Sequence, residues 1–123
     1  MSDKLGEGDI LHLERGANFF GQESKGYAQL RGNGVLVITG KELYFEMWMP
    51  ERELSVPLSS ILRIETPRFY LGKTKGYPLL KVVFRNSRGE ADSMAWMVRD
   101  LSKCKRILGE ARSRGLSMAE APV

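Results

Sequence analysis

Cysteine and histidine are nearly absent from this chain of 123 residues, which has one of each, Cys104 and His12. A single cysteine excludes a framework of internal disulfides and fits a reducing compartment. With one histidine and one cysteine, we expect no His/Cys metal cluster, no metal site and no cofactor. His12 alternates with apolar neighbours, a pattern that indicates a residue on a strand face.

Long apolar runs are also missing. No stretch reaches the roughly 18 apolar residues of a membrane span, and the first residues lack the charged-then-apolar pattern of a signal peptide. We therefore expect a cytoplasmic protein, with peripheral contact to a membrane left open. The length fits one domain, which we place at residues 1–114, followed by a mobile C-terminal tail at residues 115–123.

A complete phosphate-binding loop is missing as well. The segment "PRFYLGKTKGYP", residues 67–78, contains Gly72-Lys73-Thr74, the end of such a loop. The full motif needs a second glycine five residues earlier, where this chain has Pro67, which has no N–H group to donate to a phosphate. The pattern excludes a nucleotide site here and leaves a loop with three cations, three aromatic residues and two glycines.

Catalytic groups do not pair in this sequence. The acidic residues stand singly at turns or at outward strand positions, so no spacing places two of them together for acid–base work. We therefore expect no enzyme and no catalytic residues. The acids concerned are Glu42, Glu46, Glu51, Glu53, Glu65, Glu90 and Asp92.

Positive charge is present and concentrated in one region. The net charge is +4, and between Arg63 and Arg88 the chain has seven lysines and arginines against one acid, Glu65. A basic segment indicates a local anionic partner, although solvated strand faces give the same counts.

Alternation of apolar and polar residues predicts strands along most of the chain. A short first strand at residues 10–13 precedes a turn at Gly16-Ala17-Asn18, and residues 27–30 and 35–39 form a tight hairpin about Asn33-Gly34. Further strands follow at about 42–49, 52–58, 61–66, 79–85 and 91–98. The residues predicted to point inward are Leu43, Phe45, Met47, Leu54, Val56, Leu58, Leu80, Val82, Phe84, Met94, Trp96 and Val98.

A helical period replaces the strand pattern near the C-terminus. Asp100 is the predicted N-cap and Gly115 the predicted end. The outer side of the helix is basic, which is typical of a solvated face and also suits a docked partner. Such a sequence predicts a mainly β fold with one C-terminal α-helix: a partly open barrel or sandwich of about seven antiparallel strands, capped by the amphipathic helix. The predicted apolar stripe comprises Leu101, Cys104, Ile107, Leu108 and Ala111, with Cys104 a buried small hydrophobe.

Several segments resemble one protein family. The stretches "GEGDILHLERGANFF", "GNGVLVITGKELYF", "LSVPLSSILRIETP", "LLKVVFRNSRGE" and "MAWMVRD" are similar to the GRAM branch and the small bacterial members of the pleckstrin-homology-like superfamily, over roughly residues 6 to 112. The resemblance implies seven strands in meander order closed by a C-terminal helix, and an intracellular, non-enzymatic module that binds lipid or protein. Phosphoinositide-binding members carry basic residues between their first two strands. Here the early hairpin offers only Arg31, so the resemblance implies no inositol-phosphate site there.

The loop at residues 67–78 is the first candidate site. Arg68, Lys73 and Lys75 could meet anionic lipid headgroups while Phe69 and Tyr70 enter the bilayer interface. At about 1 kcal/mol per cation, three cations give roughly 3 kcal/mol, which is weaker than about millimolar affinity. Membrane recruitment would therefore also need the aromatics, a homo-oligomer or a fused module. The other interpretation is that the aromatics pack over the sheet while the lysines are solvated.

Trp48 and Met49 are candidate contacts for a protein partner, because neighbouring strand residues face opposite sides and one of them must leave the core. Packing of Trp48 in the core or at a hairpin end is the other interpretation. The functional hypothesis is thus a non-enzymatic binding or adaptor module that recognises a protein partner or an anionic membrane surface. A small β-barrel that binds single-stranded nucleic acid is the less favoured alternative, with Phe69, Tyr70, Tyr77, Lys81 and Arg85 as its contacts.

Overall fold

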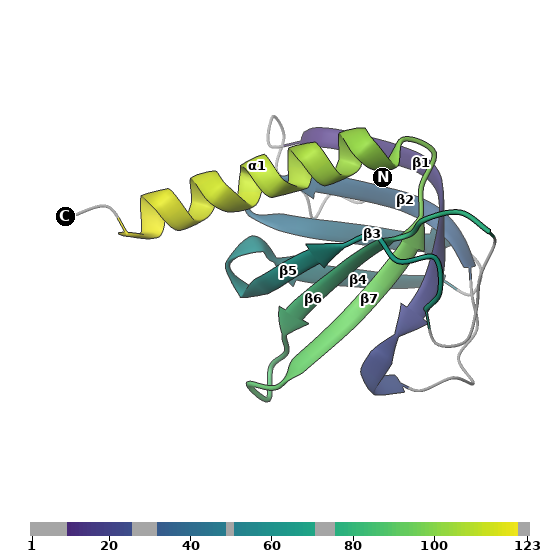
Figure 1. Ribbon diagram of the computed structural model, residues 1–123, viewed down its shortest axis with the longest axis horizontal. Coiled ribbons are helices and arrows are strands. Elements are labelled where there is room, and N and C mark those ends of the chain that lie inside the picture. Colours follow the sequence, from purple (N-terminus) through teal and green to yellow (C-terminus); the bar gives the residue numbers. More distant parts are fainter. Residues whose placement is uncertain (1–9, 26–31, 49–50, 71–75, 121–123) are drawn as a thin grey trace.

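The computed structural model describes residues 10–25, 32–48, 51–70 and 76–120, with the backbone alone described for Lys25 and for residues 115–120. A seven-stranded antiparallel sheet and one long helix make up the described chain (Figure 1). The elements are β1 (Ile10–Gln22), η1 (Glu23–Lys25), β2 (Gly32–Thr39), β3 (Glu42–Trp48), β4 (Glu51–Pro57), η2 (Leu58–Ser60), β5 (Ile61–Glu65), β6 (Leu80–Arg85), β7 (Ala91–Met97) and α1 (Leu101–Glu120).

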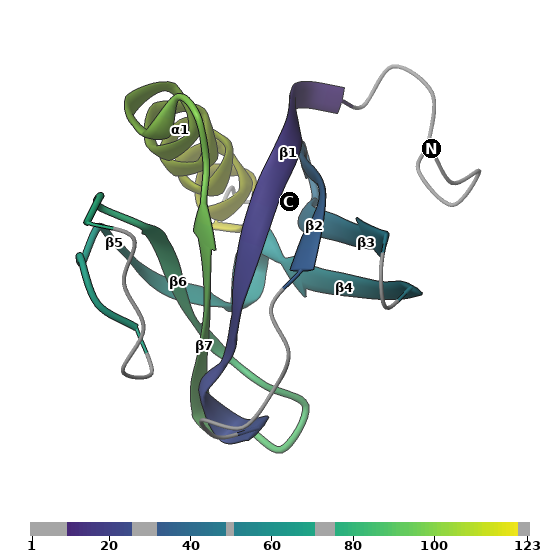
Figure 2. The ribbon, with the colours of Figure 1, turned by 90° about the vertical axis from the view of Figure 1, so that its right-hand side faces the viewer.

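The strand order is β4-β3-β2-β1-β7-β6-β5, which places β1 at the centre of the sheet. The first part of β1 pairs with β2, and its last residues pair with β7. The outer strands β4 and β5 are joined through η2 but do not pair with each other, so the sheet is a partly open barrel. Figure 2 shows α1 over the opening between the two halves of the sheet.

Strand β1 can serve both halves because it bends at two glycines. Gly16 has φ +75° and Gly21 has φ +132°, and the register shifts between Arg15 and Ala17 and again between Phe19 and Gly21. Such bulges turn a strand without ending it. The predicted turn at residues 16–18 is therefore wrong, since the positive φ of Gly16 bends a continuous strand.

The predicted hairpin turn at Asn33-Gly34 is also wrong, because both residues lie inside β2. A Cβ atom built on Gly34 would lie 2.0 Å from the backbone oxygen of Glu46 on β3. The glycine thus allows the two strands to approach closely, which is the second common reason for glycine in a strand. Residues 27–30, predicted as the partner strand, lie outside the described residues.

The core between the sheet and α1 confirms most of the predicted inward positions. The rings of Phe19, Phe45 and Trp96 form its centre, with centroids 5.6 to 5.8 Å apart in tilted and edge-on arrangements, as aromatic clusters prefer. The inward residues found buried in this core are Leu43, Phe45, Met47, Val56, Leu58, Leu80, Val82, Phe84, Met94 and Trp96, with Leu54 and Val98 partly buried against it.

Helix α1 begins as predicted and ends later than predicted. The Asp100 carboxylate accepts a hydrogen bond from the Lys103 backbone N–H at 3.1 Å, which confirms the N-cap. The stripe of Cys104, Leu108 and Ala111 is buried. The helix continues through Gly115 to Glu120, because a glycine inside a helix costs only about 1 kcal/mol. Among the described residues, no helix is long and apolar enough to cross a bilayer.

Arg112 ties the helix to the edge of the sheet. Its guanidinium donates to the backbone oxygens of Ile61 and Leu62 at 3.0 and 3.2 Å. Both acceptors belong to β5, whose outer edge has no strand partner in the described part of the chain. The arginine therefore satisfies carbonyl groups at an edge that a neighbouring strand would otherwise cover.

Candidate functional site

Two hydrogen bonds join the two ends of the loop at residues 67–78 to each other. The Leu79 N–H donates to the Pro67 oxygen at 2.7 Å, and the exposed Arg68 guanidinium donates to the Gly76 oxygen at 2.8 Å. Lys73 and Lys75, two of the predicted anion contacts, lie outside the described residues. Arg68 therefore has a structural contact of its own, because it bridges the two ends of the loop.

Tyr70 is an anchor beneath this segment. Only 5% of the residue is exposed, and it packs with Phe20, Leu79 and Ala95 in a second apolar cluster on the outer face of the sheet. Its hydroxyl donates to the Ser93 backbone oxygen at 2.6 Å and lies 2.8 Å from Ser93 Oγ. Burial raises the pKa of Tyr70 to about 12. A side chain held in this way offers no surface to a bilayer or to a nucleic-acid base.

Asp92 is buried next to that anchor, although the sequence suggested a turn or an outward position. Its carboxylate accepts hydrogen bonds from the Gln22 side chain, from the Ser24 N–H and hydroxyl, and from the Ser93 N–H, at 2.7 to 3.0 Å. Burial raises the pKa of Asp92, but these hydrogen bonds outweigh that effect and hold the pKa below its usual value. The cluster fixes η1 against β7, which is a structural role.

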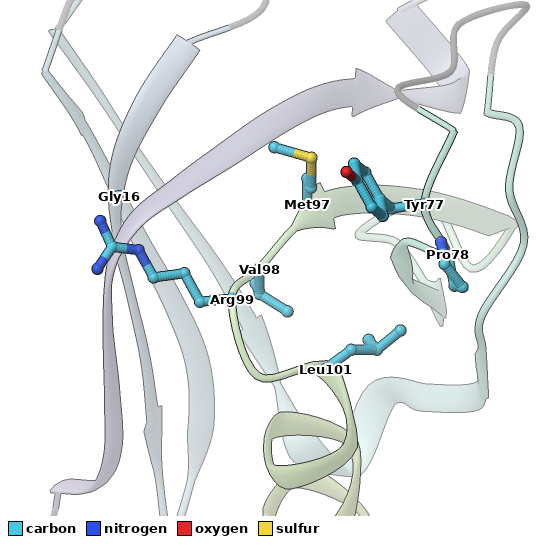
Figure 3. A pocket seen from close by; sticks show the side chains of 7 residues that line it. All are labelled: Gly16, Tyr77, Pro78, Met97, Val98, Arg99 and Leu101. Atoms are coloured by element: carbon cyan, nitrogen blue, oxygen red, sulfur yellow. The ribbon is translucent and has the colours of Figure 1, made fainter.

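An apolar pocket lies where helix α1 begins, and it has a volume of about 430 Å³. Figure 3 shows the Tyr77 ring beside Met97 at one end, Val98 and Leu101 along the base, and the Arg99 side chain extended toward Gly16. Tyr77 is 66% exposed, so its ring forms a rim. The pocket is lined by Gly16, Tyr77, Pro78, Met97, Val98, Arg99 and Leu101.

Three segments distant in sequence build this pocket. The bend of β1 at Gly16 forms one wall, and Tyr77-Pro78, just before β6, form the opposite one. The connection from β7 to α1 supplies the base and the cation Arg99, which has no acceptor among the described residues. Because the charged lining contributed by the described residues is one guanidinium, without an acid or a histidine, the pocket suits binding of an apolar group joined to an anionic one more than acid–base chemistry.

Sequence reasoning missed Arg99 and Met97. Met97 did carry a signal, since it is an apolar residue on the outward side of a strand whose inward residues are Met94, Trp96 and Val98. An apolar residue on both faces of β7 indicates that a second layer covers the outer face, as the Tyr70 cluster does. Arg99 had no such signal, because its surroundings come from Gly16 and Tyr77.

Phe69 and Trp48 are exposed on different parts of the sheet. Phe69 is 67% exposed beside the buried Tyr70, and Trp48 is 54% exposed at the end of β3. Trp48 borders a shallow cavity of about 170 Å³ on the far half of the sheet, with Leu13, Arg15, Val35 and Glu46. The interpretation of Trp48 as a core residue is therefore wrong. Met49 lies outside the described residues.

The basic region around β5 and β6 is partly neutralised within the fold. The Glu65 carboxylate forms ion pairs with Lys81 Nζ at 3.2 Å and with Arg63 Nε at 3.3 Å. The hydrogen bond from Lys81, followed by that from Arg63, lowers the pKa of Glu65 despite some desolvation. The ammonium group of Lys81 also lies 5.9 Å from the Tyr70 ring centroid. Two of the seven cations counted in the sequence, Arg63 and Lys81, therefore share one carboxylate and are not free to bind an anion.

One potential metal-binding cluster lies among the described residues, where the sequence led us to expect none. His12, Glu14 and Cys104 place one ligand atom each within 4.8 Å of one another, between β1 and α1. The sequence argument counted histidine and cysteine alone and overlooked a buried carboxylate as the third ligand. Burial and the Glu14 carboxylate raise the pKa of Cys104 to about 12, so the metal-free thiol keeps its proton.

Comparisons with known proteins identify the fold and no more. Neither a protein-family model nor a curated protein sequence matches the chain. Among solved structures, a chain of "The 8S snRNP Assembly Intermediate" is similar with a TM-score of 0.70 and 10% sequence identity, over 92% of this chain and 89% of that chain. At this identity the likeness shows a shared architecture.

Proposed function

We propose that this chain is a non-enzymatic binding module of the pleckstrin-homology-like, GRAM-type class, acting in the cytoplasm as an adaptor for a protein partner. The observation that carries the proposal is the apolar pocket at the start of α1, with Tyr77 exposed at its rim and Arg99 beside it. The strand order and the single capping helix support the family assignment.

The chemistry of the pocket favours a protein segment as the ligand. Tyrosine, methionine and arginine are enriched at protein interfaces, and Tyr77, Met97 and Arg99 all line this pocket. A volume of about 430 Å³ accommodates one or two large apolar side chains and lies in the usual range for binding pockets. We therefore propose a ligand peptide with an apolar side chain close to a carboxylate, which pairs with Arg99.

An anionic membrane has less support from the described residues. Of its five proposed contacts, Tyr70 is buried, and Lys73 and Lys75 are outside the described chain. Arg68 and Phe69 remain exposed, and a single cation near a bilayer is worth only about 1 kcal/mol. Nucleic acid has less support still, because Tyr70 is not accessible for stacking and Lys81 is paired with Glu65. The similar snRNP assembly chain does not change this, because a likeness at 10% sequence identity shows only a shared fold.

Selection from a displayed random peptide library tests the proposal. We expect enriched peptides to combine an apolar residue with an acidic one. Arg99→Glu and Tyr77→Ala should each weaken the purified interaction by about tenfold or more, as losses at an interface anchor do. Trp48→Ala is the matched control, because it removes an exposed aromatic residue on the far half of the sheet and should leave the affinity unchanged.

Sedimentation with lipid vesicles distinguishes the alternatives. The account predicts no binding to neutral or anionic vesicles at physiological salt, and no competition between a single-stranded oligonucleotide and the selected peptide. Salt-sensitive binding to anionic vesicles alone would favour the membrane interpretation. Peptides that bind the Arg99→Glu variant as tightly as the wild-type protein would refute the pocket as the recognition site.

A further inference from the structure

The cluster of His12, Glu14 and Cys104 is independent of the proposed peptide pocket. His12 and Glu14 are two residues apart on β1, so both side chains lie on the same face of the strand. Cys104 is in the first turn of α1, on the buried stripe that covers this face. Strand and helix therefore bring together an imidazole nitrogen, a carboxylate oxygen and a sulfur from positions about 90 residues apart.

The separations match those of ligands around one ion. Glu14 Oε1 lies 3.6 Å from His12 Nε2 and 3.3 Å from Cys104 Sγ, and all three atoms are within 4.8 Å of one another. Metal–ligand bonds of about 2.0 to 2.3 Å in a tetrahedral site place ligand atoms roughly 3.5 Å apart. A small movement of His12 or Cys104 is enough to complete that arrangement.

The buried Nε2 atom of His12 is an independent observation that points to a ligand at this cluster. This atom has no hydrogen-bond partner within the described part of the chain. Buried polar atoms are almost always paired, and an exception needs an explanation. Glu14 Oε1 is 3.6 Å away, beyond hydrogen-bond range, so the nitrogen lies at the cluster without a hydrogen bond to it.

We propose that His12, Glu14 and Cys104 bind a divalent transition-metal ion, zinc above all, which joins β1 to α1. The mixed nitrogen, oxygen and sulfur ligands favour zinc over magnesium or calcium, which prefer oxygen ligands alone. Three protein ligands leave a fourth coordination position for water. The Cys104 thiol releases its proton to solvent as the metal–sulfur bond forms.

The surroundings support the bound state. The Asp100 backbone N–H lies 3.5 Å from Glu14 Oε1, so it stays as the hydrogen-bond donor that orients the carboxylate when the thiol proton leaves. The ion would hold the first turn of α1, which begins two residues after Arg99 and contains Leu101 of the peptide pocket. Its expected role is therefore structural, fixing the wall of that pocket.

Cobalt titration of the reduced, chelator-treated protein, without a histidine tag, tests the site. The chain has one cysteine, so a cobalt–thiolate charge-transfer band can arise only from Cys104. We expect one cobalt ion per chain, displacement of the band by zinc, and a rise in melting temperature with zinc. Cys104→Ser should abolish the band, and His12→Gln and Glu14→Gln should each weaken binding by more than about tenfold.

Glu65→Gln is the matched control, because it removes a half-exposed carboxylate on the edge strand β5, three strands from β1, and should leave cobalt affinity unchanged. Far-UV circular dichroism checks that each variant is folded. Absence of the band in the folded wild-type protein, or equal cobalt affinity in His12→Gln, would overturn the proposal. Peptide selection is run separately, with and without zinc. If the metal site proves to be absent, the peptide proposal is therefore still tested by its own assay.

Discussion

The Tyr70 hydroxyl donates to the Ser93 backbone oxygen over 2.6 Å, and both residues are buried. Tyr70 is thereby held inside the fold, whereas its neighbour Phe69 is mostly exposed. The same bond attaches Tyr70 to β7, and Tyr77, just before β6, lies at the rim of the pocket. The loop at residues 67–78, which the sequence suggested as a ligand contact, thus contributes a structural anchor through Tyr70.

Removal of that hydroxyl should lower stability without changing peptide recognition. Tyr70→Phe leaves the buried Ser93 backbone oxygen without this donor and removes the hydrogen bond with Ser93 Oγ, which costs roughly 1 to 3 kcal/mol. Urea denaturation measures the loss. Tyr77→Phe is the control, since its exposed ring should keep stability within about 0.5 kcal/mol. Equal effects of the two variants would contradict the assigned roles.

The close approach at Gly34 predicts a difference between two glycines. Gly34→Ala places a methyl group against the Glu46 backbone and should destabilise the protein by about 1 to 3 kcal/mol or more. Gly40→Ala, with no atom within 4 Å of the new Cβ, should be close to neutral. Thermal melts of both variants check this. A neutral Gly34→Ala would mean that β2 and β3 are farther apart than described.

Asp92 predicts how stability depends on pH. Its folded pKa lies below the ordinary value of about 3.9, because the carboxylate form is hydrogen-bonded in the fold. The unfolded chain therefore takes up a proton first, and this contribution to stability, present above pH 4, is lost as pH falls through the folded pKa. Asp92→Asn should be less stable at pH 7 by roughly 1 to 3 kcal/mol and should lose less on acidification.

Urea unfolding at a series of pH values from 2 to 7 measures this effect. Glu90→Gln serves as the control, because it removes an exposed carboxylate two residues from Asp92 and should leave the acid-induced loss of stability as in the wild-type protein. An unchanged pH profile in Asp92→Asn would show that another group is responsible.

Arg112 should protect the edge strand β5 from opening. Arg112→Lys keeps the charge but loses the planar pair of donors to Ile61 and Leu62, so the cost should be about 1 to 2 kcal/mol. Hydrogen exchange should accelerate in β5 and change little in β2. The exposed Arg114→Lys is the control. Uniform acceleration across the sheet would indicate global destabilisation instead of edge opening.

Local patterns predicted most of the core and failed where distant backbone decides the outcome. Alternation at Leu43, Phe45 and Met47 identified an inward strand face, and the Asp100 cap located the start of α1. The glycines at 16 and 34 were misassigned, because bend, close approach and turn all favour glycine. Only the position of β3 relative to β2 shows which of these applies at Gly34.

The candidate sites were harder to predict because their residues meet only after folding. The pocket joins Gly16, Tyr77 and Arg99, and the metal cluster joins His12 with Cys104. The spacing of these residues along the sequence does not indicate that they lie close together. For Trp48 the alternating strand left two outcomes open, exposure opposite the inward Met47 or packing in the core or hairpin end, and the structure shows it exposed.

Backbone amide chemical-shift mapping with a library-selected peptide tests the central claim most directly. The account predicts that the largest changes cluster at Gly16, Tyr77 and residues 97–101, the walls of the pocket. Arg99→Glu should abolish these changes at the same peptide concentration. Changes centred instead on Trp48, or on the basic face of β5 and β6, would contradict the account and place recognition elsewhere on the sheet.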